Sequence, residues 1–397
     1  MNKTYVKMFM FVLLSFVIIM GAAHFILIDR VGFWRLIYPV QAQFARWNIR
    51  CSENAPDWMQ DSLKYIVSNQ KNLSNQIAYL DHKKKLHTCE SGWRGMVLFS
   101  EHLTANDRFR YASMTKLVTN DAVLQLIRQN KLHLNDKMVS FFDELDVQNF
   151  KDARVKDITI RDLLQQRSGF DRMQSEDVVF AMNKTPWCPS RLMQLVKLKL
   201  DFDPNQKYAY DNRNTCLLGA VIERVTGQPY RNYIQNQYQL ESRNIKFIRN
   251  FYYLDEVNYD FRNNDFWMLS QDLSFDFNAL SSSAGLSGSA EALVKLIDPM
   301  LAQPPLNIMS IALDNLAQCQ ISTFKSCNGY GMWQYQATAQ QPVMYFRNGG
   351  FPAVTSLAVV TEDKRIMVWI GNGATLYGQN HDDNMLEKYF YQALLQK

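Results

Sequence analysis

One uninterrupted apolar block near the start of the chain constrains its fold more than any other feature. Residues 8–28 read MFMFVLLSFVIIMGAAHFILI and contain no Asp, Glu, Lys or Arg. Coiled as a helix, such a block is about 30 Å long, which matches the hydrocarbon core of a bilayer. The sequence therefore predicts a transmembrane signal anchor over residues 1–30 and a juxtamembrane segment over residues 31–50.

The charges beside this block predict its orientation. Lys3 and Lys7 precede it, so the positive-inside rule leaves the N-terminus in the cytoplasm, whereas Arg30, Arg35, Arg46 and Arg50 on the far side oppose this orientation. We expect a single-pass protein of a bacterial inner membrane, with residues 51–397 on the periplasmic or extracellular side. A cleaved signal peptide is the rival interpretation, because Gly21-Ala22-Ala23 resembles a small-residue cleavage site. Both interpretations export the rest of the chain.

The cysteines agree with export. Their even number, six, fits an oxidising compartment and permits three disulfides. Cys319 and Cys327 enclose a short loop and are the first predicted pair, and a bond between Cys51 and Cys89 would tie the segment after the anchor to the first strand. Their spacings match no zinc site. No metal and no cofactor are expected.

Charge limits the possible partners. The 43 basic and 38 acidic residues are interspersed and give a net charge of only +5, which argues against a nucleic-acid-binding protein. The expected partners are a small-molecule or peptide substrate and, through residues 8–28, the membrane. The pattern assigns no oligomeric state.

Hydropathy patterns place strands toward both ends of the domain and helices between them. Strands are predicted at 94–99, 109–111, 331–335, 343–347, 357–360 and 366–370. Helices are predicted at 54–80, 115–128, 160–166, 189–198, 214–225, 290–301 and 384–396. The simplest α/β (α+β) arrangement pairs the two ends of the chain in one antiparallel sheet. A helical lobe over about 117–283 would lie at its edge, with a site between the lobes.

Ser113 and Lys116 form an SxxK motif at the predicted start of a helix. Residues i and i+3 share a helix face, so the lysine amine can reach the serine hydroxyl, which is a weak nucleophile without a base. The same spacing recurs at Ser68–Lys71 and Ser322–Lys325. Only Ser113 stands between a strand and a long apolar helix.

Two further motifs have catalytic potential. Tyr210-Asp211-Asn212 precedes an apolar helix and offers a tyrosine that can pass a proton, although a core tyrosine is the commoner role. Arg347, Asn348, Gly349 and Gly350 end a predicted strand. Glycines there allow a substrate to approach the backbone, and Arg347 can hold a carboxylate or an ionised tyrosine. An ordinary turn is the alternative.

Together the motifs resemble the serine β-lactamase and penicillin-binding-protein superfamily. The branch with class C β-lactamases, D-alanyl-D-alanine carboxypeptidases and related esterases is the most similar, over about residues 90–395. Residues 111–116 (YASMTK) resemble its SxxK box, residues 158–170 its "iTirdLLtHtSGl" segment and residues 208–227 its "YSN" segment. Residues 347–356 (RNGGFPAVTS) resemble "HTGGxPGfsS". The resemblance implies a β-lactamase/transpeptidase-like fold.

The resemblance also implies roles. Ser113 would attack a carbonyl and form an acyl-enzyme, while Lys116 and Tyr210 move the proton. The backbone amides of Ser113 and Gly350 would form the oxyanion hole, and Asn212 would position Lys116 and the substrate. A serine hydrolase of an ester or amide is therefore expected, with a cell-wall peptide or a β-lactam among the possible substrates. The alternative is an acylating or catalytically weak penicillin- or peptidoglycan-binding sensor.

Four residues depart from the family pattern. Arg347 stands in place of a Lys or His and cannot relay protons. Asn348 replaces a small hydroxyl residue, and Ala353 replaces a Gly. Asp211 replaces the Ser of "YSN", and we expect it to pair with Arg347 or to disfavour an anionic substrate. These changes argue against β-lactamase activity more than against hydrolysis.

Overall fold

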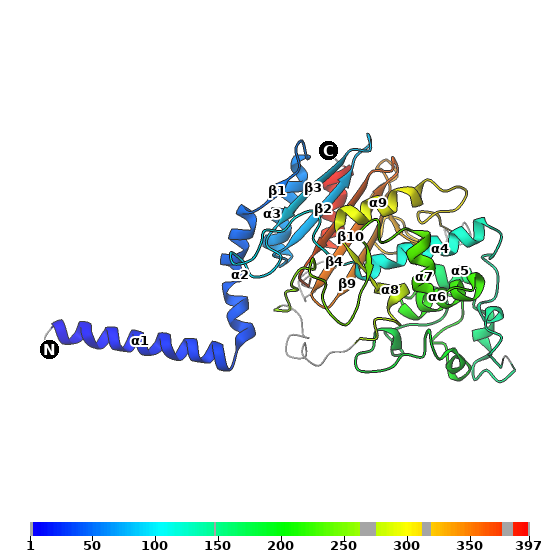
Figure 1. Cartoon of the computed structure of the whole chain (residues 1–397), viewed down its shortest axis with the longest axis horizontal. Helices are drawn as coiled ribbons and strands as arrows, with labels where there is room; N and C mark the ends of the chain where they lie inside the picture. The colour runs from blue at the N-terminus through cyan, green and yellow to red at the C-terminus, as the bar shows by residue number, and fades with distance from the viewer. Residues whose placement is uncertain (1–2, 147, 263–274, 312–318, 375–383, 396–397) are drawn as a thin grey trace.

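The computed structural model describes residues 3–146, 148–262, 275–311, 319–374 and 384–395. Its main element is an antiparallel sheet with helices on both faces, and helix α1 (Lys3–Leu27) extends away from the domain (Figure 1). Within the described part of the chain, α1 alone is long and apolar enough to cross a membrane, and none of its apolar window, Tyr5–Phe25, is buried.

Both ends of the domain contribute to the large sheet, as predicted. The strand order is β1-β3-β2-β11-β10-β9-β8-β7, and the pairing of β2 with β11, Asn75 opposite Gly371, joins the two ends. The strands are β1 (Arg50–Cys51), β2 (Asn75–Leu80), β3 (Leu86–Ser91), β7 (Cys327–Asn328), β8 (Trp333–Tyr335), β9 (Met344–Phe351), β10 (Val354–Thr361) and β11 (Ile366–Gly371).

Helices cover both faces of the sheet, so its central strands are buried on both sides. One face packs on α3 (Asp57–Asn69) and α10 (Met385–Leu395), around Trp369 and Phe390. The other face packs on α9 (Ala290–Leu301) and on the helical lobe. Helix α2 (Arg30–Trp47) lies between α1 and the domain (Figure 1).

The helical lobe centres on α4 (Thr115–Arg128) and α6 (Asn212–Thr226), which contact each other. Gly227 ends α6 with a left-handed backbone, φ +67°, which glycine adopts without steric cost. The smaller helices are α5 (Ile160–Leu164), α7 (Tyr230–Gln237) and α8 (Ser281–Ala284). A three-stranded sheet, β4 (Phe109–Arg110), β6 (Leu286–Gly288) and β5 (Lys246–Phe247), lies beside them.

Three of the sequence predictions for the N-terminal half are wrong. The helix predicted over 54–80 ends at Asn69, and the chain then forms β2. The predicted strand 94–99 is an irregular segment that exposes Met96, Leu98 and Phe99. The helix predicted at 189–198 is a 3₁₀ turn over Leu192–Lys197. At Asn75–Leu80, pairing with β3 and β11 outweighs the local helical pattern.

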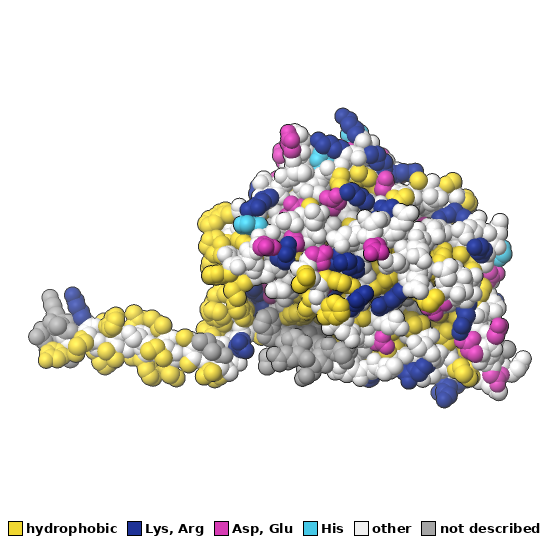
Figure 2. Space-filling model, viewed as in Figure 1, with side chains coloured by type: hydrophobic (Ala, Val, Ile, Leu, Met, Phe, Trp, Pro, Cys, Tyr) yellow, Lys and Arg dark blue, Asp and Glu magenta, His cyan; other side chains and the backbone are white. Residues whose placement is uncertain are grey.

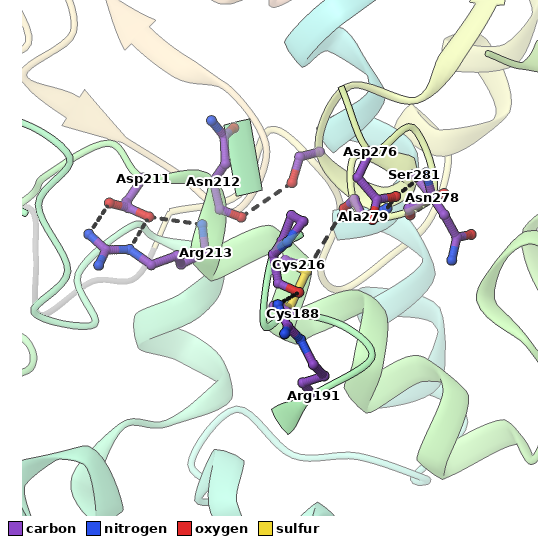
Figure 3. Close-up of a disulfide and its surroundings, with 12 residues drawn as sticks. Cys188, Arg191, Asp211, Asn212, Arg213, Cys216, Asp276, Asn278, Ala279 and Ser281 are labelled. Atoms are coloured by element: carbon purple, nitrogen blue, oxygen red, sulfur yellow. Dashed lines mark hydrogen bonds and ion pairs between the residues drawn. A yellow bond between two sulfur atoms is a disulfide. The ribbon is translucent and has the colours of Figure 1, made fainter. Parts of the chain in front are cut away.

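All six cysteines are paired. The predicted bonds Cys51–Cys89 and Cys319–Cys327 are present. The third bond, Cys188–Cys216, joins the loop before the 3₁₀ turn to the first turns of α6 (Figure 3). It therefore fixes the helix that begins with Asn212 to the irregular part of the lobe.

Candidate active site

Ser113 lies where β4 passes into α4 through a 3₁₀ turn, Ala112–Met114. Ala112 adopts φ +51°, in the left-handed region, which costs a non-glycine residue about 1 kcal/mol or more. This turn leaves Ser113 partly exposed at the start of a helix whose other residues in the first turn are buried. The helix N-terminus also favours negative charge that develops at this position.

Lys116 follows one helical turn later, and its side chain is fully buried. Its amine donates to Ser113 Oγ at 3.2 Å, to Asn212 Oδ1 at 2.7 Å and to the Ser283 carbonyl at 2.9 Å. These three acceptors satisfy the ammonium and hold Nζ against the hydroxyl. The i, i+3 proximity predicted from the sequence is therefore present.

Tyr210 and Asn212 come from the start of α6. The Tyr210 hydroxyl lies 2.6 Å from Ser113 Oγ, and Asn212 Oδ1 lies 3.4 Å from the same Tyr210 hydroxyl. Asp211 caps the helix by accepting a hydrogen bond from the Arg213 amide. The expectation that Asp211 pairs with Arg347 is wrong, because Asp211 forms a buried ion pair with Arg213 at 2.6 Å (Figure 3).

The environment lowers the pKa of both candidate proton carriers. Burial is the main cause of the lowered pKa of Lys116, and the positive charge of Arg347 lowers it further. Burial alone would raise the pKa of Tyr210. The positive charges of Lys116 and Arg347 outweigh that effect, so the pKa of Tyr210 falls. The pair is thus arranged to lose a proton more readily than either isolated side chain.

Strand β9 forms the other wall of the site. Arg347 is 2% exposed, and its guanidinium lies 4.7 Å from the Trp333 ring centroid and 5.5 Å from that of Tyr210. Its Nε and Nη2 atoms have no hydrogen-bond partner among the described residues. A buried guanidinium without an acceptor is costly in a native fold unless a ligand or a developing charge supplies one.

The glycines of β9 allow this strand to pass close to the backbone around Ser113. A Cβ on Gly349 would lie 3.0 Å from the Ser113 amide nitrogen and 2.8 Å from the Tyr111 carbonyl, so only glycine fits there. Gly350 is exposed and faces open space. Asn348 is the one predicted residue that points elsewhere, because its amide donates to Glu387 on α10, at the opposite face of the sheet.

Sequence reasoning missed Asp177. It accepts a hydrogen bond from the Asn212 amide at 2.6 Å. A carboxylate there accepts only, so it fixes the Asn212 NH₂ group toward itself and the carbonyl oxygen toward Lys116. Asp177 precedes a short 3₁₀ turn, Val178–Phe180, in an irregular loop 35 residues before its partner. No local pattern marks it.

Comparisons with known proteins bear on the fold and the family of the chain. The family model described as "Beta-lactamase" matches residues 85–238. A D-amino acid amidase from Ochrobactrum anthropi SV3 has the same fold, with a TM-score of 0.63 at 17% identity, over 85% of this chain and 99% of the amidase. The octameric penicillin-binding protein homologue from Pyrococcus abyssi gives 0.60 at 17% identity, over 86% of this chain and 77% of its own.

The chain belongs to the serine β-lactamase and penicillin-binding-protein superfamily, a group of β-lactamase-fold hydrolases. Within it, the chain is 35% identical to the probable fimbrial assembly protein FimD, serogroup H1, of Dichelobacter nodosus. That similarity extends over 364 residues, 91% of this chain and 90% of the relative. The predicted fold and family are therefore confirmed.

Proposed function

We propose that this protein is an exported, membrane-anchored serine hydrolase that cleaves an ester or amide through an acyl-enzyme on Ser113. The observation that carries the proposal is the placement of Ser113 Oγ within hydrogen-bond distance of both Tyr210 OH, at 2.6 Å, and Lys116 Nζ, at 3.2 Å. A nucleophile in contact with a base, which other groups orient, is the arrangement of covalent catalysis. The name of the FimD relative favours a role in fimbrial assembly.

In the proposed acylation, the Lys116–Tyr210 pair accepts the Ser113 proton as Oγ attacks the carbonyl carbon of the substrate. The pair then delivers this proton to the leaving group as the scissile bond breaks. Water, deprotonated by the same pair, attacks the carbonyl carbon of the acyl-enzyme. The bond to Ser113 Oγ breaks, the pair returns the proton to this oxygen, and the acid is released. Asn212 keeps the amine of Lys116 directed at Ser113 through its 2.7 Å hydrogen bond.

The negative charge on the tetrahedral intermediate needs preorganised donors. We assign this role to the backbone amides of Ser113 and Gly350, because β9 passes directly beside the Ser113 amide at Gly349. Arg347 would stabilise an ionised Tyr210 through its charge. Its unpartnered nitrogens could also receive an anionic group of the substrate.

The location is part of the proposal. Helix α1 is long enough to span a bilayer, and three disulfides are typical of exported proteins. We propose that α1 is an uncleaved, single-pass anchor in a bacterial inner membrane, with the domain on the periplasmic or extracellular side. An unshortened N-terminus on the mature protein, found by mass spectrometry, tests this against a cleaved signal peptide.

A substrate panel tests the catalytic proposal. The purified chain is incubated with p-nitrophenyl esters, amino-acid amides, a chromogenic β-lactam and a peptide ending in D-Ala-D-Ala. We expect steady-state turnover of at least one ester or amide, with an acylated Ser113 identified by mass spectrometry. Acylation without turnover would favour the acylating sensor instead. Absence of both would contradict the hydrolase.

Arg347 predicts a shift in pH dependence. Its positive charge lowers the pKa of both Lys116 and Tyr210, so Arg347→Met should raise both values. We expect the acidic limb of the kcat/KM profile to move upward by about one pH unit. Arg347→Lys, which retains a positive charge, is the matched control and should shift the limb much less. A limb that stays in place in Arg347→Met would contradict the electrostatic role.

Asp177 is predicted to be a positioning residue. Asp177→Ala removes the acceptor that orients Asn212, and we expect kcat/KM to fall by about 10-fold or more, by analogy with other residues that orient catalytic groups. Asp177→Asn keeps an acceptor and should retain most activity. Because the negative charge of Asp177 raises the pKa of Lys116, Asp177→Asn should also move the acidic limb to lower pH. Equal activity of Asp177→Ala and the wild type would refute this role.

A further inference from the structure

Helix α2 carries an apolar stripe that the domain does not cover. Phe33, Leu36, Val40 and Trp47 are 39–71% exposed. At 100° per residue they fall within an arc of about 60° on the helix surface. The opposite side of the helix, Tyr38, Ala42 and Ala45, is buried against the domain. The stripe is therefore a defined outward face.

The domain holds this face in a fixed direction. The Tyr38 hydroxyl donates to the Val67 carbonyl at 2.6 Å, and Arg262 donates to the Trp34 carbonyl at 2.7 Å and to Gln41 Oε1 at 2.6 Å. These bonds prevent α2 from turning its stripe inward. The segment at Met96 lies beside α2, since Trp34, Gln41 and Met96 line one groove. That segment adds the exposed Leu98 and Phe99 to the same region.

The charged residues within helix α2 are all basic. Helix α2 contains no acidic residue, and Arg30, Arg35, Arg46 and the adjacent Arg50 are exposed. An apolar helix face bordered by arginines is the pattern of a helix that lies in the interface of an anionic membrane. A face that docks on another protein has no need of this uniform positive charge.

The short link between α1 and α2 places α2 directly beside the end of the apolar helix. Only Ile28 and Asp29 separate the two helices, and Asp29 caps α2 by accepting from the Gly32 amide at 2.7 Å. The rings of Phe25 and Phe33 lie 5.9 Å apart across this junction. In Figure 1, α2 runs across the direction of α1, and Figure 2 shows hydrophobic side chains over α2 on the side from which α1 projects.

We propose that α2, together with the loop at 96–99, is a membrane-surface contact that seats the domain on anionic phospholipid. If α1 spans the bilayer, α2 lies in the plane of the headgroups with its stripe in the acyl boundary and its arginines at the phosphates. The domain is then held against the membrane at one orientation instead of swinging on a tether. This inference rests on the proposed anchoring by α1.

Spin labelling of the full chain in vesicles tests the contact. All six native cysteines are paired, so Val40→Cys provides a free thiol for a nitroxide. Val12→Cys in α1 and Lys131→Cys, an exposed site in the helical lobe, are the membrane and aqueous references. The vesicles contain phosphatidylethanolamine with or without phosphatidylglycerol. Collision rates with oxygen and with a nickel chelate report the depth of each label.

We expect the label at Val40 to favour oxygen, as the label at Val12 does, and the label at Lys131 to favour the nickel chelate. Removing phosphatidylglycerol, or adding Arg46→Gln, should move the Val40 label toward the aqueous value. A Val40 label as aqueous as Lys131, with Val12 in the bilayer, overturns this inference and leaves the anchor intact. An aqueous Val12 label instead refutes the anchor. Dipolar coupling between Val40 labels of two chains would show a dimer face and also overturn the proposal.

Discussion

Ser113→Ala is expected to abolish covalent labelling by a fluorophosphonate and to lower kcat/KM on the best substrate by about 10⁴-fold or more, as for other covalent nucleophiles. The hydroxyl forms the bond to the acyl group, and no neighbouring group replaces it. Lys116 is fully buried, and its amine is held by Asn212 and by the Ser283 carbonyl. The measurement is gel fluorescence of the labelled protein together with steady-state hydrolysis.

Ser322→Ala is the matched control, because Ser322 and Lys325 form an SxxK motif in an exposed loop closed by Cys319–Cys327. This variant should label and turn over like the wild type. The unfolding midpoint of Ser113→Ala should stay near that of the wild type, since the lost hydroxyl is partly exposed. Labelling of Ser113→Ala at the wild-type level would refute the assignment of the nucleophile.

The fold was predictable where periodicity and topology agree. Helices α4, α6 and α9 and strands β9, β10 and β11 follow clear patterns, and their order along the chain requires the two ends to meet in one sheet. Strand β2 was not predictable, because its Asn75 and Gln76 are polar yet buried. Asn75 accepts from the indole of Trp369 at 3.1 Å, and Gln76 donates to the Thr104 carbonyl at 2.6 Å.

At the exposed loop Met96–Phe99 the prediction fails in the opposite way, because a strand is predicted where none forms. Its apolar residues predict a strand, whereas the structure exposes Met96, Leu98 and Phe99 in an irregular segment beside α2. An apolar pattern indicates that its residues are shielded from water, but it does not show whether a protein core or another apolar environment shields them. A run that fails to become a strand and remains exposed is therefore a candidate contact surface.

The residues of the candidate site also differ in how far the sequence alone predicts their contacts. Ser113 and Lys116 are one helical turn apart, so their contact is local and visible in the sequence. The approach of Tyr210 and Arg347 depends on motif order and on the resemblance to a family. Asp177 depends on neither. Asp211 pairs with Arg213, two residues further along the chain, and not with Arg347.

Lys116→Met is expected to lower the rate of acylation by about 10³-fold, within the range for loss of a positioned general base. Methionine matches the length of the buried chain but cannot accept or donate the proton. It also leaves Asn212 Oδ1 and the Ser283 carbonyl without their donor, so the unfolding midpoint should fall as well. Single-turnover kinetics with an activated ester measures the chemical step, and thermal unfolding measures the structural part of the effect.

Tyr210→Phe separates catalysis from stability, because it removes only the hydroxyl 2.6 Å from Ser113 Oγ. If Lys116 and Tyr210 move one proton together, each single variant already disables the pair. The double variant should then be about as slow as Lys116→Met alone, and the two effects should not multiply. Multiplicative losses would show that the two residues act independently. Near-normal acylation by Lys116→Met would remove the lysine from the proton transfer altogether, leaving the ionised Tyr210 beside Arg347 as the base.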